Sequence, residues 1–403
     1  MSPPAERNRL ASFVAERSSH PSTMRRRFVK SARLLALSTV AAVLAAVAVA
    51  TVSADSSPTF GDRAVYLATA EKGVAQIEHA WWNPNLGWYN QYLSIPEQLP
   101  LATAWDIFPL FEALDAIAIA DPSAANQSAV TDFGIGAERY WNPALQPTGG
   151  YAFYPDPQVT GGSAFFDDTG WLGVAFFDAY RATQNRRFLR DAIRAFRFID
   201  IVGWAGDSGG GVWWDTEHHY KTAEPLAAAA VLGAEIYERT HIRWYFRETK
   251  KLIAWADVHA WNSARGLYAR SDVSDTVMNY VEGMMIGAQV TLCRATRDRS
   301  RCNRAEQLAE AADVAFPPAY HWTPETDAIY LRWMLALYAR DHDDRWYALA
   351  DEKAQEALAN ARDATGLFTK RWDGGYASPD RLLTAASTVS LFAWLAAAPE
   401  PRD

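Results

Sequence analysis

Hydrophobic positions along this chain alternate between two kinds of segment. Residues 170–180 contain one charged residue and are apolar at almost every position. In residues 186–200, apolar side chains recur every three or four positions from Phe188 to Ile199, among seven charged residues. The first pattern predicts a helix buried on all sides, and the second predicts an amphipathic helix with one face in solvent.

The same pairing occurs three more times. Apolar segments precede amphipathic ones at 225–237 and 242–258, at 283–292 and 302–316, and at 328–338 and 344–358. The four apolar helices end alike, near Thr183, Thr240, Thr296 and Asp341, at intervals of 57, 56 and 45 residues. This periodicity indicates a helical-hairpin repeat.

Helices that are buried on all sides need neighbours on every side, so an open row of hairpins would expose apolar faces at both ends. Closing the row into a ring removes those ends. Helical patterns at 63–82, 108–120 and 384–398 bring the count near six pairs, and period-two strand patterns are sparse. We therefore predict an all-α toroid of inner and outer helices, formed by residues 64–397 as one domain and followed by a short tail, 398–403.

The connections from each outer helix to the next inner helix are long and rich in glycine and aromatic residues. Examples are residues 81–93, 138–168, 206–222 and 368–380. In such a ring these loops all gather at one face. Because binding and catalytic residues concentrate on loops held by a rigid scaffold, we expect the functional site there.

The first 54 residues differ from the rest. Residues 34–54 carry no charge and follow a basic flank in which Arg25 and Arg26 resemble a twin-arginine export signal. Small residues end the segment, as a signal peptidase requires, but 21 apolar residues are also enough to span a bilayer. We expect residues 1–54 to be a signal peptide or a membrane anchor, followed by a linker at 55–63. Either alternative places the body outside the cytoplasm, secreted or membrane-anchored.

Cysteine usage fits an exported chain. Cys293 and Cys302 are the two cysteines, and eight residues separate them. An exported chain with two cysteines most simply pairs them in a disulfide. The alternative is two unpaired thiols, because spacing does not show whether the sulfur atoms meet.

Charge and tryptophan content narrow the class of partner. Without residues 1–54 the chain has 31 basic and 45 acidic residues, a net charge of −14. Such a surface repels phosphate backbones, which argues against nucleic acid as a partner. The 17 tryptophans supply flat amphipathic rings, which suit the apolar faces of sugars as well as a core.

Asp167 and Asp168 are adjacent, and they directly precede the apolar segment at 170–180. Retaining glycosidases hold two carboxyl groups about 5 to 5.5 Å apart. Neighbouring residues have Cα atoms about 3.8 Å apart, so an Asp-Asp pair can reach that separation. The pattern therefore predicts a pair of catalytic carboxylates.

The environment of the pair favours different protonation states for its two members. Backbone N–H groups at a helix start favour one ionised carboxylate, and repulsion together with apolar shielding keeps the other protonated. The shielding residues are Phe165, Phe166 and Trp171. The alternative is that one Asp caps the helix and the other is solvated, since Asp is a preferred cap.

Three segments resemble glycoside hydrolase family 76, the endo-α-1,6-mannanases. They are residues 165–185 around the Asp pair, 209–240 with its Gly-Gly-Gly-Val-Trp-Trp-Asp run, and 278–298. The resemblance runs over most of 64–397. It implies an (α/α)6 toroid with a catalytic Asp-Asp pair before an inner helix.

The resemblance also implies a retaining mechanism on an α-1,6-mannan, without a cofactor. Asp167 would attack the anomeric carbon to form a glycosyl-enzyme ester while Asp168 protonates the leaving O6. Asp168 would then deprotonate the water that releases the product. Transglycosylation needs the same two residues, and a catalytically idle glycan-binding envelope protein is a rival of another class.

Other matching positions predict sugar contacts. Trp213 and Trp214 could form a subsite wall or pack in the core, and Tyr280 could contact a sugar. Lys221 is expected to pair with a carboxylate near the site rather than lie on the surface. The full set of predicted substrate-binding residues is Trp88, Trp105, Trp171, Trp213, Trp214, Tyr220, Lys221, Tyr280, Glu282 and Trp372.

Three departures from the family pattern concern the sugar contacts. Thr222 replaces an Asn, and Val281 and Glu282 replace Asn-Gln. Amides suit bidentate contacts with hydroxyls, so these changes put the exact sugar in doubt. Glu282 could bind a hydroxyl itself or lie beside Lys221.

Metal and phosphate chemistry find little support in the sequence. His218 and His219 are adjacent rather than spaced as helical metal ligands, and residues 271–275 are too short for a calcium loop. The glycine-rich run at 207–211 lacks the Lys-Ser/Thr of a phosphate loop.

Overall fold

A computed structural model describes residues 60–96, 98–156, 162–368, 371–374 and 381–401. The predicted signal or anchor at 1–54 and most of the linker lie outside the described residues. None of the described helices is both long enough and apolar enough to cross a membrane.

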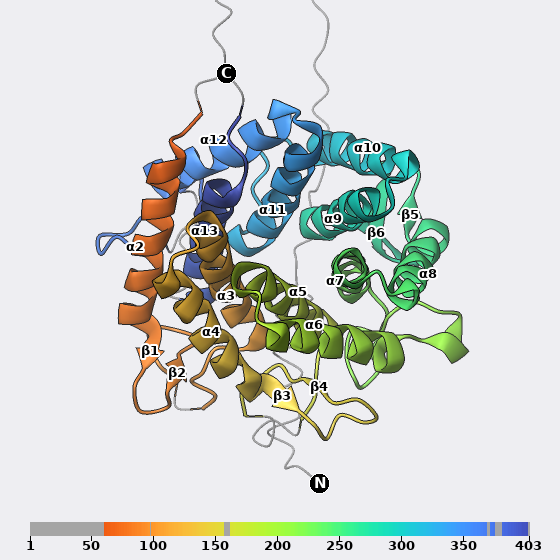
Figure 1. The fold of residues 1–403 in the computed structure, drawn as a ribbon, viewed down its shortest axis with the longest axis horizontal. Coiled ribbons are helices and arrows are strands. Elements are labelled where there is room, and N and C mark those ends of the chain that lie inside the picture. Colours follow the sequence, from red (N-terminus) through yellow and green to blue (C-terminus); the bar gives the residue numbers. More distant parts are fainter. Residues whose placement is uncertain (1–59, 97, 157–161, 369–370, 375–380, 402–403) are drawn as a thin grey trace, which may run out of the picture. The chain divides into compact units, whose positions relative to one another are not determined.

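The described residues form twelve α-helices that alternate between an outer and an inner layer (Figure 1). The outer helices are α2 (Arg63–Trp81), α4 (Ala124–Ala137), α6 (Arg186–Phe198), α8 (Arg243–His259), α10 (Arg299–Ala315) and α12 (Asp344–Asn360). The inner helices are α3 (Ala104–Ala120), α5 (Phe166–Thr183), α7 (Ala223–Thr240), α9 (Asn279–Thr296), α11 (Pro324–Asp341) and α13 (Leu382–Ala397).

The inner helices close into a ring. Each contacts the next, from α3 through α5, α7, α9 and α11 to α13, and α13 packs against α3. Helix α5 is buried at 16 of its 18 residues, whereas its outer partner α6 is buried at 6 of 13. The predicted all-α toroid is therefore confirmed, with inner helices buried on all sides and outer helices facing solvent on one side.

The hairpin repeat has a common local geometry. Four inner helices end at a non-glycine residue with φ between 55° and 58°: Gln184, His241, Arg297 and His342. In each case its N–H donates to the carbonyl four residues earlier, and an outer helix begins within two residues. This left-handed cap satisfies a carbonyl at the helix end and reverses the chain tightly.

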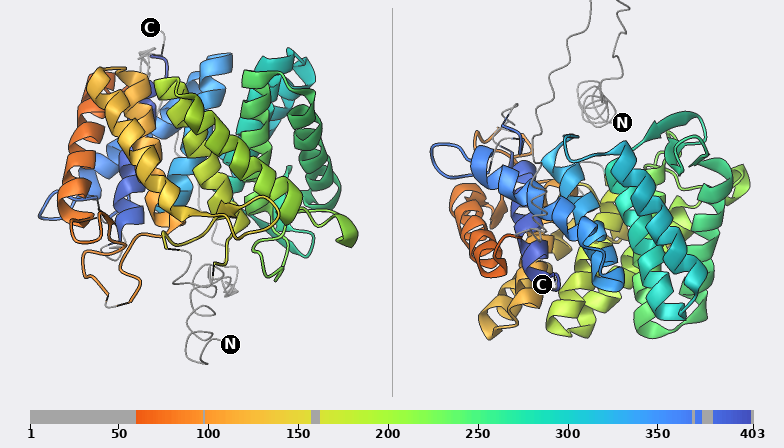
Figure 2. Two further views of the ribbon diagram at one scale, coloured as in Figure 1. Left: turned by 60° about the horizontal axis from the view of Figure 1, so that its bottom comes forward. Right: turned by 90° about the horizontal axis from the view of Figure 1, so that it is seen from above.

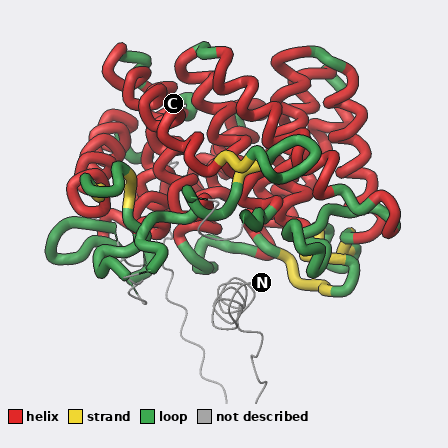
Figure 3. The backbone as a smooth tube through the Cα atoms, turned by 90° about the horizontal axis from the view of Figure 1, so that it is seen from below, coloured by secondary structure: helices red, strands yellow, loops and turns green. Residues whose placement is uncertain are grey.

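The two ends of the ring differ (Figures 2 and 3). The long outer-to-inner loops gather at one end, here called the open end, and the short inner-to-outer turns gather at the other, the turn end. Because every inner helix begins at the open end, residues in its first turn share that end. The expected convergence of the long loops is confirmed.

Short antiparallel strands lie in the long loops, although the sequence showed few strand patterns. They are β1 (Trp82–Asn83) with β2 (Trp88–Tyr89), β3 (Trp141–Asn142) with β4 (Gly150–Tyr151), and β5 (Trp261–Asn262) with β6 (Leu267–Ser271) and β7 (Ser274–Val277). Three further helical turns are η1 (Glu138–Tyr140), η2 (Ile199–Gly203) and η3 (Gly206–Ser208).

The predicted disulfide is confirmed. Cys293 in the last turn of α9 is bonded to Cys302 in the first turn of α10, with Cα atoms 5.1 Å apart. It joins an inner helix to its outer partner at the turn end.

Ionisable side chains are buried inside the ring. Arg332 on α11 forms ion pairs with Glu112 on α3 and Asp178 on α5, and its guanidinium lies 4.4 Å and 4.3 Å from the ring centres of Trp333 and Trp394. Asp115 is also fully buried, and neither of its carboxyl oxygens has a hydrogen-bond partner among the described residues.

We expect stability to fall as pH rises because of Asp115. Burial, with a contribution from Asp178, raises the pKa of Asp115 well above its usual value near 3.8. A raised folded-state pKa means that the stabilisation is complete below the unfolded pKa and is lost as pH rises through the folded one. Asp115→Asn should therefore flatten the decline in the urea midpoint as the pH rises above about 4, the unfolded pKa of an aspartate. An identical decline in the variant would contradict this assignment.

Candidate active site

Asp167 and Asp168 lie in the first turn of α5, at the open end. The sequence placed them before the helix, but α5 begins one residue earlier, at Phe166. The N-cap is Phe165, which makes no side-chain capping bond, so neither Asp is the cap residue. Asp167 is 7% exposed and Asp168 has no exposed surface.

Two N–H groups donate to the Asp167 carboxylate. The indole Nε1 of Trp214 lies 3.2 Å from Oδ2, and the backbone N–H of Asp168 lies 2.9 Å from Oδ1. Hydrogen bonds of this kind favour the ionised form of a carboxylate and restrict its orientation. Asp167 is thus held in a fixed orientation at the start of an inner helix by two N–H donors.

The loop before α7 braces this pair. The Phe166 N–H donates to the Trp214 carbonyl at 2.8 Å, and the Trp214 N–H donates to the Tyr220 carbonyl at 2.8 Å. The Trp214 ring lies between Phe165 and Tyr220, with ring centres 4.8 Å from each. The loop therefore positions the Trp214 indole N–H on Asp167.

The glycine run before this loop has a steric cause. Gly209, Gly210 and Gly211 have φ between 80° and 85°, a region that favours glycine. A Cβ atom at Gly210 or Gly211 would lie 2.7 Å from the Trp255 ring. The run lets the loop pass close to α8 and deliver Trp213 and Trp214 to the open end.

A charged cluster lies beside the Asp pair, and the sequence analysis missed it. Glu224, in the first turn of α7, is 3% exposed and accepts from Arg270 Nε at 3.1 Å. The Tyr280 hydroxyl lies 3.5 Å from the same carboxyl oxygen, and Thr222 donates to the other oxygen. Burial raises the pKa of Glu224, and Arg270 opposes that rise; the charge of Asp167 raises it further.

Aromatic side chains form a row across the starts of three inner helices. Trp171 lies 5.5 Å from Trp105 and 6.3 Å from Tyr280, and Tyr280 lies 5.9 Å from Trp322, measured between ring centres. Trp105, Tyr280 and Trp322 are partly exposed. Of these four residues the sequence analysis missed Trp322, which lies in the loop between α10 and α11.

Trp213 and Tyr220 are also partly exposed in the loop before α7. Trp214 and Trp171 are almost fully buried, so their part in the site is to support Asp167 and the aromatic row. The alternative of core packing therefore applies to Trp214 but not to Trp213.

Three side chains that the sequence analysis expected to contact sugar are buried in the core. Trp88 donates to the Tyr140 hydroxyl at 3.0 Å, and Trp372 donates to the Thr388 hydroxyl at 2.9 Å. Glu282 has no exposed surface and accepts from the Tyr268 N–H at 2.7 Å. Glu282, which stands where the family pattern has Gln, thus contacts β6 in the core and does not line the open end.

Lys221 contacts a carbonyl and an aromatic ring rather than the carboxylate that the sequence analysis expected. Its amino group donates to the Ser208 carbonyl and lies 5.3 Å from the centre of the Trp213 ring. No carboxylate of the described residues lies within 4.0 Å of it. Lys221 therefore supports the Trp213 ring by a cation–π contact.

Among the described residues, no group of three or more His, Cys, Asp or Glu side chains is arranged to hold a metal ion. His218 stacks on Trp213 with ring centres 4.9 Å apart, and His219 bonds to Asp215 at 2.6 Å. Both histidines thus have contacts within the loop before α7.

At the open end of the ring, two adjacent carboxyl groups lie near several aromatic rings. These are the groups that a glycoside hydrolase uses to cleave and to bind a sugar chain. The sequence profile of glycosyl hydrolase family 76 matches residues 144–387, and the chain belongs to that family.

Solved structures with the same fold include members of this family. A family 76 mannosidase from Bacteroides thetaiotaomicron superposes with a TM-score of 0.75 at 18% identity, covering 83% of this chain and 98% of the other. An α-1,6-mannanase from a Salegentibacter species has a TM-score of 0.67 at 19% identity, covering 82% and 99%. An inactive variant of that mannanase, with two consecutive aspartates replaced, was solved with α-1,6-mannotetrose and has a TM-score of 0.68 at 19% identity, covering 82% and 98%. Comparison with curated protein sequences gave no significant match.

Proposed function

We propose that this protein is a retaining glycoside hydrolase that cleaves α-1,6-mannosidic bonds within an extracytoplasmic mannan. The observation that carries the proposal is the Asp167–Asp168 pair in the first turn of α5, with Asp167 oriented by Trp214. The Salegentibacter mannanase supports the substrate, since replacing two consecutive aspartates gave an inactive variant that was solved with an α-1,6-mannooligosaccharide. The disulfide supports a location outside the cytoplasm.

In this mechanism Asp167 is the nucleophile. It is the more exposed of the two, and its two N–H donors stabilise the anion that attacks the anomeric carbon. The C1–O6 bond breaks as the bond from Asp167 to C1 forms, giving a glycosyl-enzyme ester.

Asp168 is the general acid and base. Burial favours the uncharged form of a carboxyl group, and in this mechanism Asp168 carries the proton that it gives to the leaving O6. The resulting carboxylate then takes a proton from the water that attacks C1 and frees Asp167. Because Asp168 has no exposed surface, its side chain must turn toward the bound sugar.

The partly exposed rings of Trp105, Trp213 and Tyr280 are suited to bind the apolar faces of successive mannose units. The Glu224–Arg270 pair offers an acceptor and a donor for vicinal hydroxyls next to Asp167. Replacement of the family's Asn by Thr222 belongs to this cluster, because Thr222 bonds to Glu224.

Product analysis tests the proposal. The purified protein is incubated with linear α-1,6-mannan, with other α-mannans and with α-glucan, and the products are sized by mass. We expect a ladder of mannooligosaccharides from the α-1,6-linked polymer. Intact α-1,6-mannan beside cleavage of another glycan would refute the substrate, and products longer than the starting oligosaccharide would indicate transglycosylation.

We expect Trp214→Phe to lower kcat about ten- to a hundredfold with little change in KM, because it removes one hydrogen bond to a charged group. The Phe ring keeps the contact with Phe165 and Tyr220. Trp88→Phe is the matched control, since it removes an indole bond to Tyr140 in the core and should leave kcat unchanged. Equal kcat values for the two variants would show that Trp214 does not position Asp167.

A further inference from the structure

The turn end of the ring carries an unusual set of cations. Three neighbouring outer helices, α6, α8 and α10, each begin with an arginine: Arg186, Arg243 and Arg299. A cation at a helix start opposes the helix macrodipole and is unfavourable for stability. Because this unfavourable placement recurs at three adjacent helices, helix stability does not explain it.

These arginines belong to a larger group, which we call the basic face. All of its members are exposed and have no carboxylate within 4.0 Å among the described residues. They lie in or next to the turns that join α5 to α6, α7 to α8 and α9 to α10, or in the first two turns of α6. They are Arg186, Arg190, Arg239, Arg243, Arg297 and Arg299. The chain after residue 54 has a net charge of −14. The basic face is thus a positively charged group on a protein that is negatively charged as a whole.

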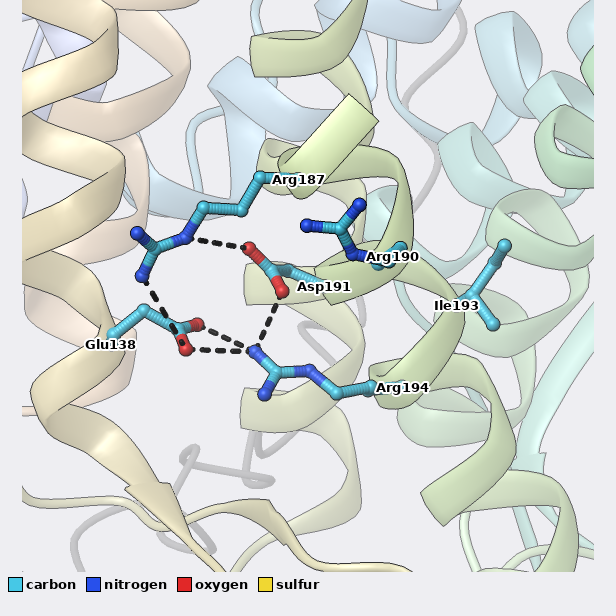
Figure 4. A pocket seen from close by; sticks show the side chains of 6 residues that line it. All are labelled: Glu138, Arg187, Arg190, Asp191, Ile193 and Arg194. Atoms are coloured by element: carbon cyan, nitrogen blue, oxygen red, sulfur yellow. Dashed lines mark hydrogen bonds and ion pairs between the residues drawn. The ribbon is translucent and has the colours of Figure 1, made fainter. Parts of the chain in front are cut away.

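Two cavities follow the outer side of α6, and they differ in charge. One, of about 560 Å³, contains Arg187 and Arg194, which form ion pairs with Glu138 and Asp191 (Figure 4). Arg190 lines this cavity too, but no ion pair ties it there (Figure 4). The arginines of this cavity other than Arg190 are thus already neutralised.

The second cavity, of about 390 Å³, lies nearer the turn end. Among the described residues, its lining contains three arginines, Arg186, Arg190 and Arg239, and no acidic residue. Leu189 and Ile193 give it an apolar floor. Three guanidinium groups around an apolar floor match an anionic group such as a phosphate that is joined to an apolar body.

We propose that the basic face binds the anionic headgroups of a lipid membrane, with a headgroup phosphate in the cavity formed by Arg186, Arg190 and Arg239. Clustered arginines near an anionic leaflet are attracted to it. Ile242, which is 51% exposed between Arg239 and Arg243, supplies an apolar contact at the same turn. An extended acidic polymer would gain nothing from Ile242 or from the apolar floor.

The place where the described chain begins fits this orientation. Helix α2 starts at the turn end, where Arg63 donates to the Ala396 carbonyl at the end of α13. In the sequence, five residues separate the predicted apolar segment 34–54 from Phe60. The basic face therefore lies at the same end of the ring as Arg63, and a membrane bound there leaves the Asp pair, at the open end, facing away from the lipid.

Hydrogen–deuterium exchange of the full chain tests the proposal independently of any anchor. Exchange is compared on vesicles of phosphatidylcholine and on vesicles that also contain phosphatidylglycerol. We expect slower exchange at residues 184–190, 239–243 and 297–301 on the anionic vesicles only. Each cation near an anionic leaflet contributes about fivefold in affinity, so R186Q/R190Q/R239Q should weaken the response to phosphatidylglycerol about a hundredfold and abolish this protection.

The control variant K72Q/R197Q/R265Q removes three exposed charges outside the basic face and should keep the protection. Equal exchange on both kinds of vesicle would overturn the proposal. So would protection of these turns by soluble alginate but not by anionic vesicles, which would assign the face to an acidic polysaccharide. Loss of protection in both variants would show a general effect of net charge and no site.

Discussion

Asp167→Asn is expected to reduce cleavage of α-1,6-mannan by at least about a thousandfold, because it removes the group that forms the covalent intermediate. Asp168→Asn should cause a loss of similar size, since general acid–base catalysis contributes about 10² to 10⁴. Initial rates of reducing-end formation provide the measurement. Asp132→Asn, on the exposed outer surface of α4, is the matched control and should keep full activity.

A substrate with a good leaving group separates the two roles. An aryl α-mannoside with a nitrophenolate leaving group needs little protonation, so Asp168→Asn should recover part of its rate of aryl release. Asp167→Asn should stay inactive on both substrates because the attack on C1 is lost. Recovery by Asp167→Asn instead would reverse the assignment, and full mannan cleavage by either variant would remove that residue from the mechanism.

Arg332→Met is expected to lower the free energy of unfolding by about 3 to 5 kcal/mol, because it leaves the buried carboxylate of Glu112 without its counter-charge. Arg332 forms ion pairs with Glu112 and Asp178 inside the ring, where Asp115 is already buried. Burial raises the pKa of Asp178 to about 6. Without the Arg332 guanidinium, Asp178 keeps its ion pair with Arg181, whereas Glu112 loses the cation that compensates its burial.

Urea denaturation measures this loss, with Arg294→Met as the control. Arg294 pairs with Glu238 at the surface, where such pairs contribute less than about 1 kcal/mol. Neutralising the partners of Arg332 with Glu112→Gln and Asp178→Asn should restore most of the stability. Equal losses for Arg332→Met and Arg294→Met would show that the buried cluster has no special importance.

The ring was predictable because its signal is repeated. Apolar segments such as 170–180, paired with amphipathic ones such as 186–200, require a closed arrangement, and four hairpins repeat the requirement. Helix α4 was missed because only Val130, Phe133, Gly134 and Ala137 are buried on it, which leaves a weak apolar stripe.

A recurring dipeptide in the sequence marks the short hairpins, and the sequence analysis did not use it. Trp-Asn follows three outer helices, at Trp82, Trp141 and Trp261, and each time the Trp pairs across a hairpin with a tyrosine. Two-residue strands are too short for a period-two pattern to be visible. Only the recurrence of the dipeptide after α2, α4 and α8 could have revealed them.

The part of the site formed by residues adjacent in the sequence was predictable. The part formed by residues that only folding brings together was missed. Asp167 and Asp168 stand together in the chain, whereas Glu224 and Arg270 are 46 residues apart. Glu224 nevertheless had a signal, as the acidic residue at the start of an otherwise uncharged stretch of α7. Trp88 and Trp372 are buried in the core. The sequence could not show this, because an aromatic residue in a glycine-rich loop gives the same pattern whether its side chain faces the core or the open end.

The anomeric configuration of the first product tests the central claim most directly. Proton NMR during the first minutes of α-1,6-mannooligosaccharide hydrolysis, before mutarotation, should show the α-anomer appearing first, because two displacements at C1 by Asp167 and then water restore the starting configuration. Initial release of the β-anomer would mean that water attacks C1 directly, and it would contradict a covalent role for Asp167.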